Sequence, residues 1–207
     1  MRFWNKKNNI PKDCKVGISL VTYDQTDCLQ NLIFSLKCQT FKNFIIAVIH
    51  DGSWTLQAKN SFENAVGNDD RFIALNSEKR LNKFGHNNRQ IGFDILKNLN
   101  CNWIGTMNGD SYYVPVYFES MLSKAYEDKS NFVYCNMVHS HRMWTMLDTQ
   151  LNRSYIDGGC FLANIDLIDE YKWDSLDFAA DWFFISKLKS NKNFKSSKVD
   201  SCLFVHN

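Results

Sequence analysis

The sequence predicts an α/β fold in which a mostly parallel β-sheet is flanked by helices. Two patterns predict it: nearly continuous runs of β-branched and apolar residues alternate with segments of helical periodicity, and polar residues follow the end of each run. Such runs are typical of strands buried on both faces, as in a parallel sheet. Alternating strands and helices indicate βαβ units, whose right-handed crossovers bring the strand C-termini to one edge.

Four strands are expected in the first half of the chain, with helices between them. The run KVGISLVTY opens the series, and apolar residues then recur at i, i+3, i+4 and i+7 from Leu29, which predicts an amphipathic helix. A second apolar stripe begins at Ile91. The predicted strands span residues 15–23, 44–50, 71–76 and 102–107. The predicted helices span residues 26–39, 88–99 and 116–128.

The second half of the chain is less regular. We expect a strand over 131–138 and, within 154–171, a strand with a Gly-Gly break followed by a short helix. A helix over 179–189 and a strand or extended tail over 198–206 complete the chain. Only two prolines occur and no Pro/Ser-rich linker divides the sequence, so residues 1–207 are predicted to form one domain.

The composition excludes several classes of protein. A net charge of +2 without a concentrated basic face argues against a nucleic-acid partner. The seven cysteines contain no Cys-x-x-Cys pair and are odd in number, so reduced core cysteines are expected rather than a disulfide framework or a zinc site. The sequence shows neither a leader-like N-terminal apolar run nor a transmembrane-length one, so we predict a cytoplasmic protein.

Polar residues collect where the four predicted parallel strands end. In open α/β sheets ligands bind beyond the carboxyl ends of the strands, so these residues form a predicted ligand edge. They are Thr22, Tyr23, Asp24, His50, Asp51, Gly52, Ser53, Asn76, Asn108, Gly109 and Asp110.

The order of the motifs along the chain resembles that of the family 2 glycosyltransferases, which have the Rossmann-like GT-A fold. The first helix ends in a Ser-x-x-x-Gln-Thr pattern at residues 35–40, and the second strand is followed by Asp-Gly-Ser at 51–53. Arg89 and Gly92 are in register with a Gly-x-x-x-Ala-Arg-Asn-x-Gly stretch of the family. Asn-Gly-Asp at 108–110 stands where the family has Asp-x-Asp.

The resemblance implies a nucleotide-binding half over about residues 1–112 and an acceptor-binding half over about residues 113–207. The implied reaction transfers a sugar from a nucleotide-sugar donor, a UDP-sugar, to a hydroxyl of a glycan or similar acceptor, with inversion at the anomeric carbon. The sequence departs from the family pattern at three places, where an acidic residue is replaced by His50, Asn108 or Ala180.

A donor and metal site follows from the resemblance. Asp110 and the near-terminal His206 are the implied ligands of Mn²⁺ or Mg²⁺, which neutralises the diphosphate leaving group. The simpler alternatives are a loop-starting aspartate and an ordinary tail histidine. Arg89 begins a helix, where a cation opposes the macrodipole, and this favours a ligand-facing role. The implied nucleotide-sugar contacts are Thr22, Tyr23, Asp24, Asp51, Arg89, Asn108, Gly109 and Asp110.

Asp181 is the implied general base, in the Ala-Asp-Trp segment at 180–182. A carboxylate beside Trp182 is expected to have a raised pKa through desolvation, which suits a base. Asp174 and Asp177 are nearby alternatives, and a helix-stabilising aspartate is the simpler interpretation. The implied acceptor contacts are Asp157, Gly158, Gly159 and Trp182. The segment His139-x-His141 with Arg142 also suggests a phosphate or metal contact, although such a pair is usually just exposed.

Two other functions stay open at the level of sequence. One is a non-catalytic nucleotide- or sugar-binding domain of a larger glycan-synthesis enzyme or complex, which Asn108 favours somewhat. The other is a sugar nucleotidyltransferase, which is disfavoured because VTYDQTD lacks the Gly-rich, basic phosphate loop expected after the first strand.

Overall fold

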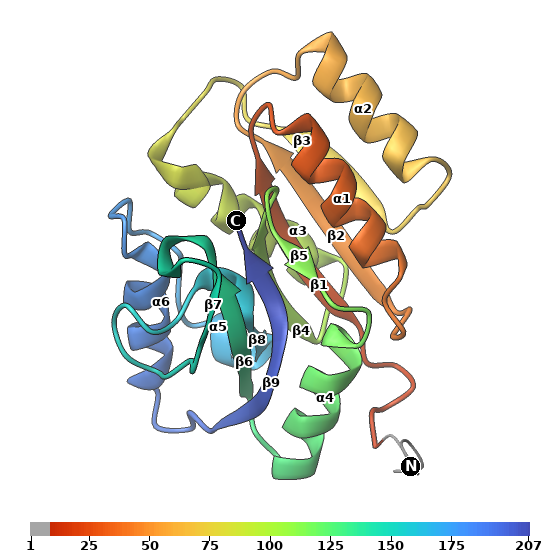
Figure 1. Cartoon of the computed structure of the whole chain (residues 1–207). Coiled ribbons are helices and arrows are strands. Elements are labelled where there is room, and N and C mark those ends of the chain that lie inside the picture. Colours follow the sequence, from red (N-terminus) through yellow and green to blue (C-terminus); the bar gives the residue numbers. More distant parts are fainter. Residues whose placement is uncertain (1–8) are drawn as a thin grey trace.

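The structure, a computed structural model, describes residues 9–207 and contains one nine-stranded sheet with helices on both faces (Figure 1). Residues 1–8, where the predicted nucleotide-binding half begins and on which the prediction about the N-terminal leader falls, lie outside the described residues. The strand order is β3-β2-β1-β4-β8-β6-β9-β5, with β7 paired to β6.

The four strands predicted to be parallel are parallel. They are β1 (Val16–Thr22), β2 (Phe44–His50), β3 (Phe72–Asn76) and β4 (Trp103–Asn108). Their registers align the strand ends, because Thr22 lies opposite His50, His50 opposite Asn76, and Val21 opposite Asn108. The polar residues that follow these strands therefore share one edge of the sheet, as the sequence predicts.

Helices cover both faces of this parallel part. The helices are α1 (Thr26–Lys37), α2 (Leu56–Val66), α3 (His86–Asn98) and α4 (Tyr117–Asp128). In Figure 1, α1 and α2 lie in front of the sheet and α3 lies behind it. Gly92 of α3 permits this packing, since a Cβ there would come within 2.1 Å of Ser19 Oγ on β1.

Helix α2 was not expected from the sequence. Only Ala58, Phe62 and Val66 are buried on it. Its apolar stripe is therefore narrow, and the mostly polar sequence of the segment resembles that of a loop. The available signal was at its start, where Thr55 Oγ1 accepts a hydrogen bond from Ala58 N and caps the helix.

The second half of the chain extends the sheet with both strand directions. It contributes β5 (Tyr112–Tyr113), β6 (Phe132–His139), β7 (Thr145–Leu147), β8 (Phe161–Asn164) and β9 (Ser196–His206). Strand β8 is antiparallel to β4 and β6, so β6 runs in the direction of β4, and β9 pairs parallel to β6. The C-terminal ends of β6 and β9 therefore reach the same edge as those of β1 to β4.

The remaining elements are short or lie at the rim. They are α5 (Ile165–Ile168), α6 (Ala180–Lys189) and the 3-10 turns η1 (Lys83–Gly85), η2 (Ser140–Arg142) and η3 (Gly158–Cys160). The strand expected on both sides of Gly158-Gly159 forms only after it, as β8, because the glycines themselves make the η3 turn. None of the helices between residues 9 and 207 combines the length and apolar character needed to cross a membrane.

Candidate active site

The edge formed by the C-terminal ends of β1, β2, β4, β6 and β9 gathers polar atoms that have no protein partner. Folded proteins normally pair their buried polar groups, so a group of unpaired ones indicates a place prepared for a ligand. Within residues 9–207, the unpaired buried atoms at this edge belong to Thr22, His86, Asn88, Arg89, Asp110, Ser111, Trp173 and His206.

Tyr23 and His50 form one corner of the site. The Tyr23 ring is 37% exposed, and the guanidinium of Arg80 lies over it, 3.6 Å from the ring centroid. His50 is buried, stacks on Trp54 at 4.3 Å and accepts a hydrogen bond at Nε2 from Asp24 N at 3.3 Å. Its Nδ1 then donates to Gly52 O at 2.9 Å. His50 is thus a packed support for the Tyr23–Asp24 turn, which accounts for a residue other than aspartate there.

Asp51 anchors the loop that precedes α3. Its carboxylate accepts hydrogen bonds from the backbone N–H groups of Leu81 and Asn82, both at 2.8 Å, and from Asn88 Nδ2 at 3.2 Å. The loop then passes through Asn82, Lys83 and Phe84, all with positive φ. Such conformations are costly for non-glycine residues and persist where surrounding contacts impose them. The predicted contact of Asp51 with the nucleotide sugar stays a prediction.

Arg89 lies at the centre of the site. It is buried, and its Nη1 donates to Phe84 O at 3.0 Å while its Nη2 donates to Asn108 Oδ1 at 2.5 Å. Burial lowers the pKa of Arg89, and the carboxylates of Asp157, Asp181 and Asp110 oppose that shift. Since the Asn108 carbonyl is used by Arg89, its NH₂ group is left to donate toward a ligand.

Asp110 offers an oxygen to the same space. Its Oδ2 accepts a hydrogen bond from Gln25 Nε2 at 3.3 Å, and its Oδ1 is buried without a partner. The residue before it, Gly109, packs against the end of β1, because a Cβ on Gly109 would lie 2.6 Å from Thr22 Oγ1. Thr22, Gly109 and Asp110 are therefore together, as predicted, although their binding roles remain predictions.

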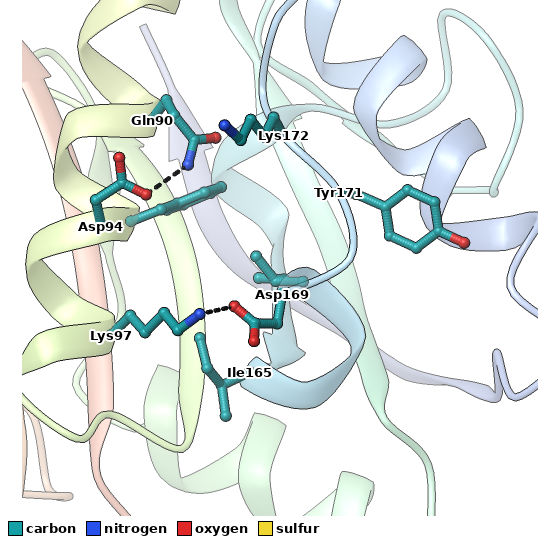
Figure 2. A pocket seen from close by; sticks show the side chains of 9 residues that line it. Gln90, Asp94, Lys97, Ile165, Asp169, Tyr171 and Lys172 are labelled. Atoms are coloured by element: carbon teal, nitrogen blue, oxygen red, sulfur yellow. Dashed lines mark hydrogen bonds and ion pairs between the residues drawn. The ribbon is translucent and has the colours of Figure 1, made fainter.

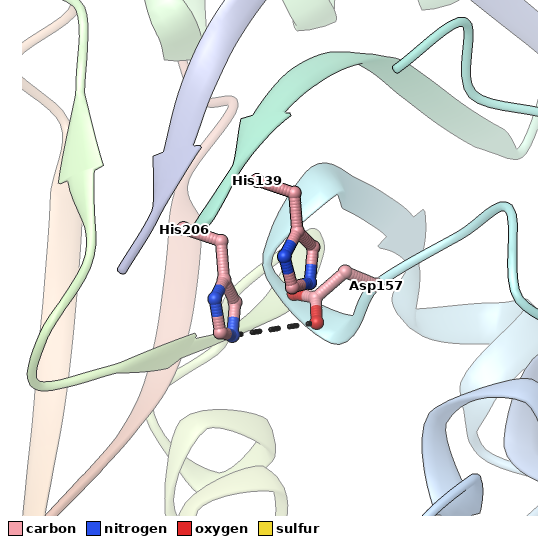
Figure 3. A group of neighbouring side chains, drawn as sticks. All are labelled: His139, Asp157 and His206. Atoms are coloured by element: carbon pink, nitrogen blue, oxygen red, sulfur yellow. Dashed lines mark ion pairs between the residues drawn. The ribbon is translucent and has the colours of Figure 1, made fainter. Parts of the chain in front are cut away.

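Asp157, His139 and His206 form a cluster with the donor atoms of a metal site (Figure 3). One donor atom from each lies within 4.8 Å of the others. His206 Nε2 is 3.8 Å from Asp157 Oδ2, and the His206 ring stacks on His139 at 4.4 Å with an interplanar angle of 11°. Burial, together with the neighbouring His206, lowers the pKa of His139. The cluster can present a carboxylate and neutral imidazole to a divalent cation.

Asp181 has the properties of a general base. It lies in the first turn of α6, where its Oδ1 accepts a hydrogen bond from Trp182 N at 2.7 Å. Burial and the neighbouring Asp157 raise the pKa of Asp181 to about 7. The sequence predicts that desolvation raises the pKa of Asp181. In the structure the carboxylate of Asp157 adds to that shift. A carboxyl group with that pKa is well matched to proton transfer near neutral pH.

The two alternative aspartates are occupied elsewhere. Asp174 is exposed and forms an ion pair with Lys187, which lowers its pKa. Asp177 Oδ1 accepts a hydrogen bond from Ala179 N at 2.9 Å, just before α6. Asp181 is therefore the aspartate of this segment that faces Arg89 and Asp157.

The glycines of η3 are explained by packing. A Cβ on Gly158 would lie 2.9 Å from Thr106 Oγ1, and one on Gly159 would lie 2.5 Å from the Tyr113 hydroxyl. The Gly159 carbonyl accepts hydrogen bonds from both Tyr113 and Tyr117. Side chains of the protein thus fill the space beside both glycines, and their contact with an acceptor remains a prediction.

Trp173 contacts the centre of the site, and the acceptor contact predicted for Trp182 stays a prediction. The Arg89 guanidinium lies 5.2 Å from a Trp173 ring centroid, whereas Trp182 lies beside the Lys189 ammonium at 5.3 Å. Trp173 also stacks near His86, a buried histidine at the start of α3 whose pKa burial lowers to about 4. His86 and Arg80 belong to no motif that predicts a ligand site, so the sequence does not indicate them. The segment His139-x-His141 does indicate His139, as a phosphate or metal contact.

A separate small cavity lies between α3 and α5, with a volume of about 130 Å³ (Figure 2). Four of its polar lining groups pair with one another: Lys97 with Asp169, and Gln90 with Asp94. These pairs help to hold the two elements together, and the cavity is lined by none of the residues at the ligand edge.

The model of one protein family matches most of the chain. It is described as "Glycosyl transferase family 2" and matches residues 18–190. A comparison with curated proteins finds no match.

Solved structures share the fold. A fragment of TarS from S. aureus, residues 1–349, in complex with UDP-GlcNAc has a TM-score of 0.74 and 14% identity, over 93% of this chain and 58% of that one. The same fragment in complex with UDP has a TM-score of 0.73 and 18% identity, over 93% of this chain and 60% of that one. The mannosyltransferase PcManGT from Pyrobaculum calidifontis was solved in complex with GDP-Man and Mn²⁺. It has a TM-score of 0.69 and 8% identity, over 97% of this chain and 60% of that one.

These likenesses confirm the predicted GT-A type of α/β fold. The chain spans less than two thirds of the length of these structures. Because the family model covers residues 18–190 of the 207-residue chain, the chain belongs to glycosyl transferase family 2.

Proposed function

We propose that the protein transfers a sugar from a nucleotide-sugar donor, a UDP-sugar, to a hydroxyl group of a glycan or similar acceptor. The observation that carries this proposal is the placement of Asp181, whose pKa is raised to about 7, beside Asp157 and Arg89 at the ligand edge. Membership in glycosyl transferase family 2 and neighbours solved with UDP, UDP-GlcNAc and GDP-Man support it.

Asp181 acts as the general base of this reaction. It accepts the proton of the acceptor hydroxyl while that oxygen attacks the anomeric carbon, opposite the departing diphosphate. One in-line displacement inverts the configuration at that carbon. Burial, together with Asp157, raises the pKa of Asp181 to about 7, so that Asp181 can take the proton near neutral pH.

The nucleotide lies across the ends of β1, β2 and β4. The base stacks on Tyr23 after the Arg80 guanidinium gives way, because a separation of 3.6 Å leaves no room for a ring between them. Thr22 Oγ1 and the Asn108 NH₂ group supply unpaired hydrogen-bonding capacity for ribose or phosphate oxygens. Asp24, Asp51 and Gly109 shape this part of the site.

Asp110 and His206 hold a divalent cation, Mn²⁺ or Mg²⁺. The bare Oδ1 of Asp110 and the imidazole of His206 fit such a role, and an imidazole ligand favours Mn²⁺. When bound, the cation neutralises charge on the diphosphate leaving group. Acceptor contacts are assigned to Asp157, Gly158, Gly159 and Trp182, in the half that follows about residue 113.

The seven cysteines are all free, as in proteins of a reducing compartment, and we place the reaction in the cytoplasm, in polysaccharide synthesis. Asn108 stands where the family pattern has an aspartate. This favours one second candidate, a non-catalytic nucleotide-sugar-binding module of a larger enzyme.

Thermal stabilisation by ligands tests the binding part of the proposal. UDP is expected to raise the melting temperature more with Mn²⁺ than without it, and Asp110→Ala is expected to remove that difference. Metal-dependent hydrolysis of UDP-sugars then separates the two candidates, because only the enzyme releases UDP from the donor. Equal stabilisation by UDP in both proteins, with or without metal, contradicts the metal assignment.

A further inference from the structure

We propose that Asp157 is a ligand of the divalent cation together with His206, and that it supplies the carboxylate that Asn108 no longer provides. His139 is a positioning residue in this arrangement: it holds the His206 ring by stacking. The inference deepens the proposed function and rests on its metal dependence. It moves the centre of cation binding from the end of β4 toward the ends of β6 and β9.

The register of two parallel strands creates the arrangement. His139 and His206 are the last residues of β6 and β9 and lie opposite each other in the ladder. Paired residues in neighbouring strands point to the same face, so the two rings meet, 4.4 Å apart and nearly parallel. Asp157 reaches the same place from the turn before η3 (Figure 3).

Hydrogen bonds fix which atoms are available. Asp157 Oδ1 accepts from Gly159 N at 2.7 Å, so the carboxylate is held and Oδ2 is left toward His206 Nε2 at 3.8 Å. His139 Nδ1 accepts from His141 N at 3.1 Å, which ties that ring to its own strand end. Two parallel stacked rings do not aim their lone pairs at one point. For this reason His139 orients its neighbour, and His206 is the imidazole ligand.

The surrounding charges favour a cation. The guanidinium of Arg89 interacts electrostatically with three carboxyl groups, those of Asp157, Asp181 and Asp110. Acidic side chains therefore outnumber basic ones among these four residues. Strand β5 pairs with β9 through Tyr112 and Val205, which brings the chain directly after Asp110 beside His206. One carboxylate and one imidazole, with Asp110 close by, leave coordination positions open for phosphate oxygens and water.

Binding of Mn²⁺ to the full chain, followed by electron paramagnetic resonance without any donor, tests the ligand assignment. Asp157→Asn keeps an oxygen for the Gly159 N–H and is expected to weaken Mn²⁺ binding at least about 10-fold. Asp177→Asn is the matched control, because Asp177 caps Ala179 N in the same way, and it should leave binding unchanged. If Asp157→Asn binds Mn²⁺ as tightly as the unaltered chain, the ligand assignment is wrong.

The stacking role has its own test. His139→Ala is expected to weaken Mn²⁺ binding about 10-fold, whereas His139→Phe retains a flat ring and should restore it. Equal loss in both variants overturns the positioning role. Asp177→Asn serves again as the control and should leave Mn²⁺ binding unchanged.

A measurement on the unaltered chain removes dependence on the folding of variants. Mn²⁺ should broaden the NMR signals of His206 and His139 at low metal ratios and leave that of His50 sharper; preferential broadening at His50 overturns the proposal. Failure of the unaltered chain to bind Mn²⁺, with or without UDP, contradicts the metal dependence of the proposed function itself. Binding that survives Asp157→Asn but not Asp110→Ala contradicts only the inference.

Discussion

Arg89 donates a hydrogen bond from Nη2 to Oδ1 of Asn108 at 2.5 Å, in the middle of a site lined by three aspartates. An aspartate at position 108 would pair its charge with this buried guanidinium. The amide leaves the guanidinium charge facing Asp157, Asp181 and Asp110. Asn108 therefore keeps Arg89 in place while its NH₂ group is available to a ligand.

Arg89→Lys is expected to lower the free energy of unfolding by about 1–3 kcal/mol. A single ammonium cannot reach both Phe84 O and Asn108 Oδ1, so one buried acceptor loses its partner. Urea denaturation measures the change. Arg153→Lys, at an exposed position, is the control and should stay within about 0.5 kcal/mol. An Arg89→Lys protein as stable as the unaltered chain would show that the two hydrogen bonds contribute little.

Tyr23→Ala is expected to weaken UDP binding by about 1–3 kcal/mol, which is roughly 10- to 100-fold in Kd, through loss of base stacking. Isothermal titration with UDP measures it. Tyr155→Ala removes another partly exposed tyrosine that faces an arginine, Arg142 at 5.7 Å, and should leave UDP binding unchanged. Equal affinity in Tyr23→Ala and the unaltered chain contradicts the placement of the base.

Asp181 makes a prediction about stability and pH. Its pKa is about 7 in the folded chain, above the value of about 3.9 for an unfolded aspartate. Its contribution to stability is present at low pH, while it is protonated, and is lost as the pH rises through about 7. The Asp181→Asn protein has no ionisable group at this position. Its free energy of unfolding, relative to that of the unaltered chain, should therefore increase between pH 5 and pH 8.

The control for that experiment has the opposite sign. The ion pair with Lys187 lowers the pKa of Asp174, so its contribution is present at neutral pH and lost as the pH falls through its folded value. The Asp174→Asn protein should therefore be less stable than the unaltered chain at pH 8, and this difference should disappear at low pH. The difference is small because the group is exposed. A relative stability of Asp181→Asn that does not change with pH would contradict the raised pKa.

The parallel half of the fold was predictable because its signals are local. Each buried strand is a continuous apolar run, and the polar residues that follow it reach the ligand edge by topology alone. Thr22, Asn108, Gly109 and Asp110 were found in this way, and the structure brings them together.

The second half could not be predicted in the same detail because its geometry depends on distant pairings. The contact of His139 with His206 requires the register of two strands whose ends lie 67 positions apart in the chain (206 minus 139). Trp173 lies beside Arg89 because of how the segment before α6 folds back, which no periodicity reveals. The helix α2 was missed because its buried stripe is only one residue wide.

The most direct test of the central claim is the pH dependence of sugar release or transfer from a UDP-sugar in the unaltered chain and in Asp181→Asn. With Asp181 as the base, the rate should rise with pH through about 7 and then level off. Asp181→Asn should lower the rate at least about 100-fold at pH 8 and leave UDP binding intact. A metal-dependent transfer rate that survives in Asp181→Asn, with the same pH profile, would contradict the account.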